Sequence, residues 1–164
     1  MPHQISRISA LVADPSAHMS ALVAVMLRSV GFRRINAILD LPHTAIELAQ
    51  TPYDLILIDD RLGGEAVNEM IRMVRRMAGH PNRETPVIMM AAAPDARMIA
   101  TARDAGVTEF LRKPFSAEHV GQRLDALRRA PRNFIEAETF SGPDRRRRTA
   151  PAARHRRASD TRPG

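Results

Sequence analysis

The sequence predicts an α/β domain built on a doubly wound, five-stranded parallel sheet with five covering helices. Short apolar runs alternate five times with segments of helical apolar spacing within about 130 residues. This alternation is typical of a parallel sheet that helices cover on both faces. The third apolar run, Tyr53 to Asp59, is almost continuously aliphatic, as expected for a strand that is buried on both of its faces.

The predicted elements follow one another along residues 1–130. The first strand is predicted at residues 8–13, and apolar spacings of three and four predict a helix from Pro15 to Val30. Gly31 stands where that helix ends. The other predicted strands are residues 35–39, 53–59, 86–90 and 109–112, and the other predicted helices are residues 42–50, 65–78, 94–105 and a last helix from its cap Ser116 to Arg129.

The positive charge of the chain lies mostly at its C-terminal end. The net charge is +7, and residues 131–164 contribute nine Arg against four acidic residues. Residues 1–130 therefore carry only +2. Because residues 131–164 offer little apolar surface to bury, we predict that they form an Arg-rich, disordered tail behind a folded domain of residues 1–130.

The composition also excludes several classes of protein. Cysteine is absent, which excludes disulfides and thiolate metal sites and fits a reducing cytoplasm. The longest apolar run, residues 21–27, is shorter than the roughly 20 residues that span a bilayer, and residues 1–10 lack the pattern of a secretion signal. Since the common nucleotide-binding and nucleophile motifs are missing too, we expect a cytoplasmic protein that is not an enzyme.

Three charged residues follow strands that end at the same edge of the predicted sheet. Asp14, Asp59 and Lys113 come directly at the ends of the first, third and fifth strands, and ligand sites of open parallel sheets lie beyond those ends. Lys113 is the single Lys among 25 basic residues. Its compact ammonium acts as a point charge where a guanidinium cannot. Two carboxylates and an ammonium predict a site for a divalent metal and a phosphoryl group.

Simpler roles remain open for the same residues. Asp14, directly before Pro15, also fits a cap of the following helix. Asp59 and Asp60 together also fit an acidic pair that keeps a loop solvated. The presence of one Lys, Lys113, among many Arg is also consistent with chance.

The sequence resembles the receiver domains of two-component response regulators over about residues 7–128. Four segments carry the resemblance, in the order and spacing of that family: LVADPS, DLILIDDRLGG, TPVIMMAA and DAGVTEFLRKPFS. The resemblance implies the flavodoxin-like receiver fold. It also implies that phosphorylation shifts the face formed by the fourth helix, the fifth strand and the fifth helix.

The resemblance implies a role for each residue of the candidate site. Asp59 matches the aspartate that accepts a phosphoryl group from a histidine kinase or a phosphotransfer protein. Lys113 matches the lysine that contacts the phosphate, and its bond to Pro114 is expected to be cis. Mg²⁺ would be held by Asp14, Asp59 and the backbone carbonyl of Arg61.

The sequence departs from the family pattern at three positions near this site and in the acceptor loop, where residues 62–65 read LGGE in place of the usual Met-Pro with a later Gly. Pro15 stands where receivers usually carry a second acid, so one metal-binding carboxylate is missing and Mg²⁺ binding is expected to be weak. The two switch positions are Ala91, which replaces the usual Thr or Ser, and Phe110, which stands where Tyr is common. Neither side chain has the hydroxyl group of the usual residue.

Three functions remain open at this point. The first is a single-domain signalling protein that accepts phosphate on Asp59 and acts on a downstream protein target, with a homodimer as an open alternative. The second is a pseudo-receiver, an interaction module that is not efficiently phosphorylated, as Pro15 and Ala91 suggest. The third is a binder of nucleic acid or of an acidic partner through the Arg-rich tail, although aromatic residues for base stacking are scarce there.

The missing carboxylate generates a first prediction. Each charge-assisted contact contributes about 1.5–3 kcal/mol, and a hard cation such as Mg²⁺ prefers carboxylate ligands. We therefore expect Pro15→Asp to raise Mg²⁺ affinity about tenfold or more. Titration of both proteins with Mg²⁺ measures the difference, and equal affinities would contradict the prediction.

Overall fold

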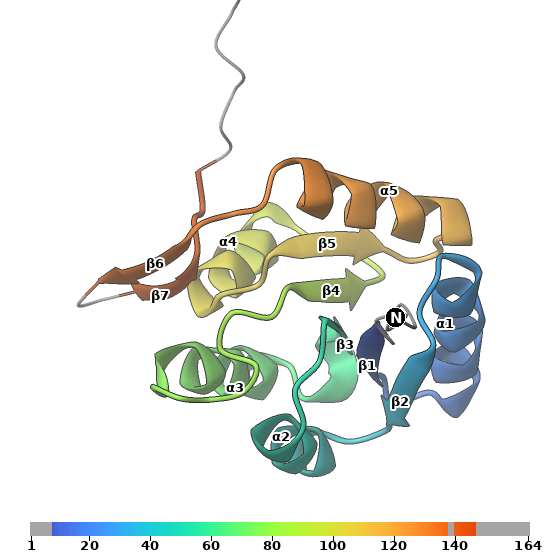
Figure 1. Cartoon of the computed structure of the whole chain (residues 1–164), viewed down its shortest axis with the longest axis horizontal. Helices are drawn as coiled ribbons and strands as arrows, with labels where there is room; N and C mark the ends of the chain where they lie inside the picture. Colours follow the sequence, from blue (N-terminus) through green and yellow to red (C-terminus); the bar gives the residue numbers. More distant parts are fainter. Residues whose placement is uncertain (1–7, 138–139, 147–164) are drawn as a thin grey trace, which may run out of the picture.

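Five parallel strands form the central sheet of the computed structural model, which describes residues 8–137 and 140–146 (Figure 1). The strands lie in the order β2-β1-β3-β4-β5, which confirms the predicted doubly wound sheet. The sheet and its helices comprise β1 (Ser9–Ala13), α1 (Ala17–Ser29), β2 (Arg34–Ile38), α2 (Leu41–Gln50), β3 (Leu55–Asp59), a 3-10 turn η1 (Asp60–Leu62), α3 (Glu65–Arg76), β4 (Val87–Ala91), α4 (Ala96–Ala105), β5 (Glu109–Arg112) and α5 (Ala117–Arg129).

Helices cover both faces of the sheet and create two apolar cores. On one face, α1 and α5 bury side chains such as Val23 and Leu124 against β1, β3 and β4. On the other face, α2, α3 and α4 pack residues such as Leu48 and Ile71 against the sheet. Because the strands β1, β3 and β4 are buried along their whole length, their sequences are almost entirely apolar. None of the helices in the described ranges combines the length and apolar character of a membrane span.

The strand order fixes where a ligand site can lie. The chain leaves β1 toward β2 at one side and returns to β3 on the other side, so the topology reverses between β1 and β3. Such a reversal opens a crevice at the carboxyl ends of the two strands. In the register of the sheet Ala13 lies beside Ile58, and the next residue of each strand is therefore an aspartate, Asp14 and Asp59.

Polar caps set the starts of most helices. The first helix begins at Ala17 and not at Pro15, because the Ser16 hydroxyl accepts a hydrogen bond from the Met19 N–H. Asp95 caps α4 in the same way. At α5 the predicted cap Ser116 forms a reciprocal capping box with His119.

A β-hairpin follows α5, where the sequence predicted disorder from residue 131 onward. Strands β6 (Phe134–Ala137) and β7 (Phe140–Pro143) pair antiparallel, and β7 packs against α3 and α4. Figure 1 shows the hairpin beside α4, at the side of the domain away from α1. The prediction of disorder is therefore wrong for these strands. Residues 147–164, which hold six of the nine Arg, lie outside the described residues.

Two arginines, Arg83 and Arg145, attach the hairpin to the domain. The Arg83 guanidinium lies 4.9 Å from the ring centroid of Phe134 and forms a 2.8 Å ion pair with Glu136. The Arg145 guanidinium lies 4.3 Å from the ring of the buried Phe140 and pairs with Asp104 of α4. Such contacts stabilise a short hairpin that lacks an apolar core of its own.

A fully buried arginine connects α3 to the ends of β4 and α4. The Arg75 guanidinium has no exposed surface and donates hydrogen bonds to the carbonyl oxygens of Arg83, Thr85 and Gly106, at 2.7–3.2 Å. Burial lowers the pKa of Arg75 to about 10, so the side chain stays charged at neutral pH. The three carbonyl groups satisfy this charge in place of a carboxylate.

Gly106 provides a test of this packing. Its φ of +115° ends α4, and an added Cβ would lie 2.7 Å from Arg75 Cγ. Gly31 has a nearly equal φ of +110° but nothing within 4 Å of the same position. We expect Gly31→Ala to lower the free energy of unfolding by about 1 kcal/mol through backbone strain, and Gly106→Ala by about 1–3 kcal/mol more through overpacking. Urea denaturation measures both, and equal losses would contradict the role of Arg75.

Candidate functional site

Asp14, Asp59 and Lys113 meet at the carboxyl edge of the sheet. The Lys113 Nζ donates to Asp14 Oδ2 at 2.9 Å and also contacts Asp59 Oδ2. Both carboxylates are fully buried, and the Lys113 side chain is only 11% exposed. The structure thus brings together the three residues that sequence analysis placed at this edge.

The backbone at the end of β5 positions Lys113 next to the two carboxylates. The Lys113 N–H donates to the Ala91 carbonyl at 2.8 Å, which extends the pairing of β5 with β4 one residue beyond Arg112. The Lys113–Pro114 peptide bond is cis, as the family resemblance implies. The Lys113 ammonium group reaches from the end of the edge strand β5 to the ends of β3 and β1.

The other carboxylate oxygens accept hydrogen bonds from the residues that follow each strand. Asp14 Oδ1 accepts from the Ser16 N–H at 2.8 Å, so Asp14 supports the turn before α1, whereas Ser16 is the cap. Asp59 Oδ1 accepts from the Arg61 N–H at 2.8 Å and lies 3.5 Å from the Arg61 Nε. All four carboxylate oxygens of the pair thus have a donor.

The pKa shifts at this site follow from burial and pairing. Burial acts to raise the pKa of Asp59, but hydrogen bonds from Lys113 and from the Arg61 N–H outweigh it and leave the pKa below its ordinary value. Burial acts to lower the pKa of Lys113, but its bonds to Asp59 and Asp14 leave that pKa raised. Asp59 is therefore an ionised carboxylate at neutral pH, with a charged ammonium beside it.

The residues implied for Mg²⁺ do not fit a tightly held ion. The described residues contain no group of three or more His, Cys, Asp or Glu side chains that could hold a metal. The two candidate carboxylates, Asp14 and Asp59, already accept hydrogen bonds from Lys113 and from backbone N–H groups. A metal would have to displace the ammonium group to reach both of them. The carbonyl of Arg61, the third implied ligand, lies in the turn η1 directly after Asp59.

The two predicted switch residues lie on neighbouring strands. Ala91 ends β4 and is fully buried, and its methyl group offers no hydrogen-bond donor to the site. Phe110, on β5, is half-buried and packs against the core that faces α2, α3 and α4. Neither side chain contributes a polar atom near Asp59.

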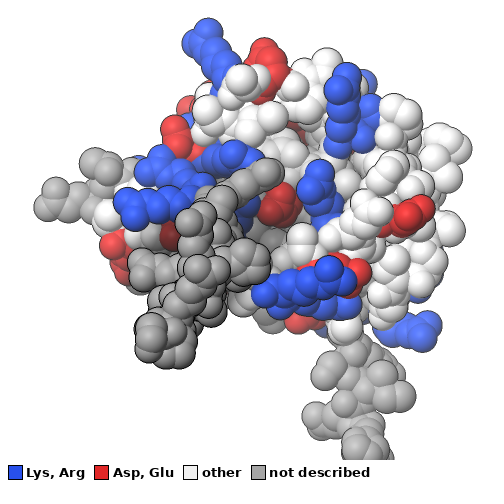
Figure 2. All heavy atoms as spheres, turned by 90° about the horizontal axis from the view of Figure 1, so that it is seen from above, with Lys and Arg blue, Asp and Glu red and all other residues white. Residues whose placement is uncertain are grey.

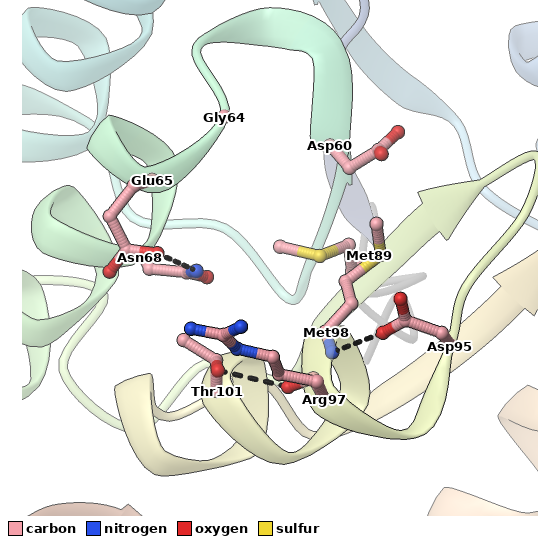
Figure 3. Close-up of a pocket in the computed structure, with 9 residues that line it drawn as sticks. All are labelled: Asp60, Gly64, Glu65, Asn68, Met89, Asp95, Arg97, Met98 and Thr101. Atoms are coloured by element: carbon pink, nitrogen blue, oxygen red, sulfur yellow. Dashed lines mark hydrogen bonds between the residues drawn. The ribbon is translucent and has the colours of Figure 1, made fainter.

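A pocket of about 300 Å³ lies beside the site, between α3 and α4 (Figure 3). Its lining includes Asp60 and Asn68, and each has a buried Oδ1 atom without a hydrogen-bond partner among the described residues. Burial and, to a smaller extent, the charge of Asp59 raise the pKa of Asp60. Asp14, Asp59 and Lys113 are not part of this pocket's lining, so it is a neighbouring feature of the site.

A comparison with known families identifies the domain. Residues 10–125 match the family model of the response regulator receiver domain. The chain belongs to this family. The match covers the sheet and its helices up to α5 and ends before the β6–β7 hairpin.

Curated relatives of this receiver domain include chemotaxis and transcriptional proteins. The chemotaxis protein CheY-3 of Vibrio cholerae is 26% identical over 117 residues, which is 71% of this chain and 88% of that protein. The phosphate regulon transcriptional regulatory protein PhoB of Klebsiella pneumoniae is 28% identical over 120 residues, or 73% of this chain and 51% of the relative. The chain thus matches about half the length of this transcriptional relative.

Solved receiver structures share the fold. Chemotaxis protein CheY4 of Vibrio cholerae superimposes with a TM-score of 0.66 at 20% identity, covering 74% of this chain and 98% of that one. The receiver domain of the sensor histidine kinase PA1611 from Pseudomonas aeruginosa has a TM-score of 0.63 at 24% identity, over 73% and 95% of the two chains. That structure has a magnesium ion coordinated in its active site cleft.

The position of the Arg61 side chain is not predicted by the sequence pattern. The resemblance assigned a role only to its backbone carbonyl, whereas the structure places its guanidinium beside Asp59 Oδ1. The sequence did offer one signal for this contact, since Arg61 is a basic residue two positions after Asp59, the candidate phosphoacceptor. The unpartnered atoms of Asp60 and Asn68 had no sequence signal, because their environment depends on the packing of α4 against α3.

The buried charge cluster generates a stability prediction. Lys113→Met leaves two buried carboxylates without their ammonium, so we expect it to lower the free energy of unfolding by about 3 kcal/mol at pH 7. Because Lys113 helps to keep the pKa of Asp59 below its ordinary value of 3.8, its contribution is present above that pH and is lost as the pH falls through the lowered pKa. The difference between wild type and variant should therefore shrink below about pH 4.

Chemical denaturation at pH 7 and near pH 3.5 measures this difference, with Arg112→Met as the control. Arg112 is the last residue of β5 and directly precedes Lys113, but the Arg112 side chain is exposed. A loss as large for the control as for Lys113→Met, or a loss that does not depend on pH, would contradict the prediction.

Proposed function

We propose that this receiver domain accepts a phosphoryl group on Asp59 from a histidine kinase or a phosphotransfer protein and signals through protein–protein contacts. The observation that carries the proposal is the bond of the Lys113 ammonium to a buried Asp59 carboxylate whose pKa is lowered. An ionised carboxylate is the form that acts as a nucleophile. A neighbouring cation offsets the negative charge that an incoming phosphoryl group brings.

The chain's own residues account for the main requirements of this reaction. A carboxylate oxygen of Asp59 attacks phosphorus, and the bond from phosphorus to the donor's nitrogen breaks as the electron pair leaves with that nitrogen. Lys113 is held by Asp14 within reach of the transferred group. Since the protein performs little covalent chemistry of its own, position and charge set the rate. If Mg²⁺ binds at all, it would supply further positive charge at Asp14, Asp59 and the Arg61 carbonyl.

The proposed downstream target is a protein that binds the side of the domain formed by β5 and α5. A cavity of about 420 Å³ lies there, lined by Lys113 together with residues such as Phe115 and Arg123. Lys113 thus lies on both the acceptor site and this cavity. A change at Asp59 can therefore alter the proposed partner-binding surface through Lys113, which contacts both. On this proposal the chain is a cytoplasmic signalling protein without an enzymatic output, and a homodimer through the same side is an alternative form of the contact.

The pseudo-receiver remains the second candidate function. It is favoured by Ala91, whose methyl group cannot bind a phosphoryl oxygen, and by Pro15, which replaces a metal-binding acid. Binding of nucleic acid has less support from the described residues. On the face that carries α5, Figure 2 shows acidic side chains interspersed with the basic ones, whereas a nucleic-acid surface gathers its basic groups into one patch or stripe.

Intact-mass measurement tests the proposed function. The full chain is incubated with acetyl phosphate, and separately with phosphorylated histidine kinases, with Mg²⁺ present. We expect the mass gain of one phosphoryl group in wild type and in Asp60→Asn, and no gain in Asp59→Asn, since the Lys113 ammonium contacts the Asp59 carboxylate, whereas Asp60 lines the neighbouring pocket.

The adjacent acid Asp60 is a matched control, because it carries the same charge one residue away. Labelling of Asp59→Asn would show that the acceptor lies elsewhere. An unlabelled wild type under all of these conditions would replace the relay with the pseudo-receiver.

A further inference from the structure

The guanidinium of Arg61 occupies a specific position at the acceptor site. Its Nε lies 3.5 Å from Asp59 Oδ1, while its backbone N–H donates to the same oxygen at 2.8 Å. The Asp59 carboxylate is fully buried, but the Arg61 side chain is 62% exposed. The Arg61 guanidinium therefore contacts Asp59, the proposed phosphoacceptor, and is also open to solvent, from which a phosphodonor would approach.

The charges in direct contact at this site already balance. Asp14 and Asp59 contribute two negative charges, and Lys113 and Arg61 contribute two positive charges. The donors of these cations and of the backbone reach every oxygen of the two carboxylates. A divalent ion would leave these four groups with an excess of two positive charges, which the neighbouring Asp60 carboxyl could offset only in part, or it would have to displace a side chain that is already paired. The disagreement between these residues and a metal site therefore has an electrostatic cause.

Arg61 also offers hydrogen-bond donors that can replace the missing hydroxyl group at position 91. Ala91 offers no hydroxyl group to a phosphoryl oxygen. A guanidinium carries five N–H donors in a planar fork that matches phosphate geometry, and the only contact of Arg61 with Asp59 that involves this fork is through Nε. Its terminal NH₂ groups can therefore bind the phosphoryl oxygens while Nε stays near the acceptor.

We propose that Arg61 takes the place of the metal ion, so that Asp59 is phosphorylated without a divalent cation. The proposal rests on the proposed role of Asp59 as phosphoacceptor. With acetyl phosphate as donor, an Asp59 oxygen forms a bond to phosphorus, the bond between phosphorus and the bridging oxygen breaks, and acetate leaves with that electron pair. Arg61 and Lys113 neutralise the charge of the transferred group from two sides.

The test compares the labelling rate of the full chain in excess EDTA and in 10 mM Mg²⁺, by intact mass after addition of acetyl phosphate. We expect the wild-type rates in the two conditions to agree within about twofold. Arg61→Gln removes the positive charge, and we expect it to slow labelling in EDTA by about tenfold or more, as expected for loss of a phosphate-binding arginine. Mg²⁺ should restore part of that loss, because the cluster then carries a net negative charge that a cation can offset.

Arg128→Gln is the matched control. The Arg128 side chain is 61% exposed, close to the value for Arg61, and lies on α5 in a long 3.8 Å ion pair with Asp125. We expect this variant to label as wild type does. Mg²⁺ titration followed by NMR provides a readout that does not depend on labelling, and we expect saturable shifts of the Asp14 and Asp59 amides to be stronger in Arg61→Gln than in wild type.

The outcomes separate this inference from the proposed function. Labelling of wild type in Mg²⁺ but not in EDTA would overturn the role of Arg61 and leave Asp59 as the acceptor. Equal rates for Arg61→Gln and Arg128→Gln in EDTA would overturn it as well. If wild type is not labelled in either condition, while a second receiver protein is labelled by the same donor, the proposed function itself fails. A circular dichroism spectrum unchanged from wild type confirms that each exposed-arginine variant is folded.

Discussion

The buried contact of Lys113 with Asp14 and Asp59 is the interaction on which the rest of the site depends. One ammonium joins residues at the ends of β1, β3 and β5. Two buried carboxylates without a cation would carry a large desolvation penalty, so the position of β5 and the ionisation of Asp59 are coupled. A change in the charge of Asp59 therefore acts on the strand and loop that hold Lys113.

The region around this cluster explains how a receiver fold can tolerate the loss of usual site residues. Pro15 and Ala91 remove a carboxylate and a hydroxyl group, but the exposed Arg61 side chain brings a charge and several donors to the same place. On the proposed role of Arg61, its charge takes the place of the metal ion, and its N–H groups take the place of the missing hydroxyl donor. The fold supplies the position, and the local chemistry can then vary.

The β6–β7 hairpin lies outside the residues that match the family model, and it packs against the helices of the domain. It holds α4 through the Arg145 pair with Asp104 and the buried ring of Phe140. The prediction of disorder was wrong for this hairpin, because two short strands with a single buried aromatic ring have the composition of a polar linker. Their stability comes from α3 and α4, which lie far away in the sequence, and no local pattern encodes that contact.

The sequence by itself determined the order of strands and helices, the two cores, and the arrival of Asp14, Asp59 and Lys113 at one edge. Those features follow from the period of apolar residues and from the geometry of parallel strands, which act locally and repeat along the chain. Only the tertiary structure decided where the Arg61 guanidinium lies, that Asp60 Oδ1 has no hydrogen-bond partner within the part of the chain that the structure describes, and that Arg75 is buried. These facts depend on the direction of single side chains and on neighbours brought together by folding, and a sequence pattern does not specify either.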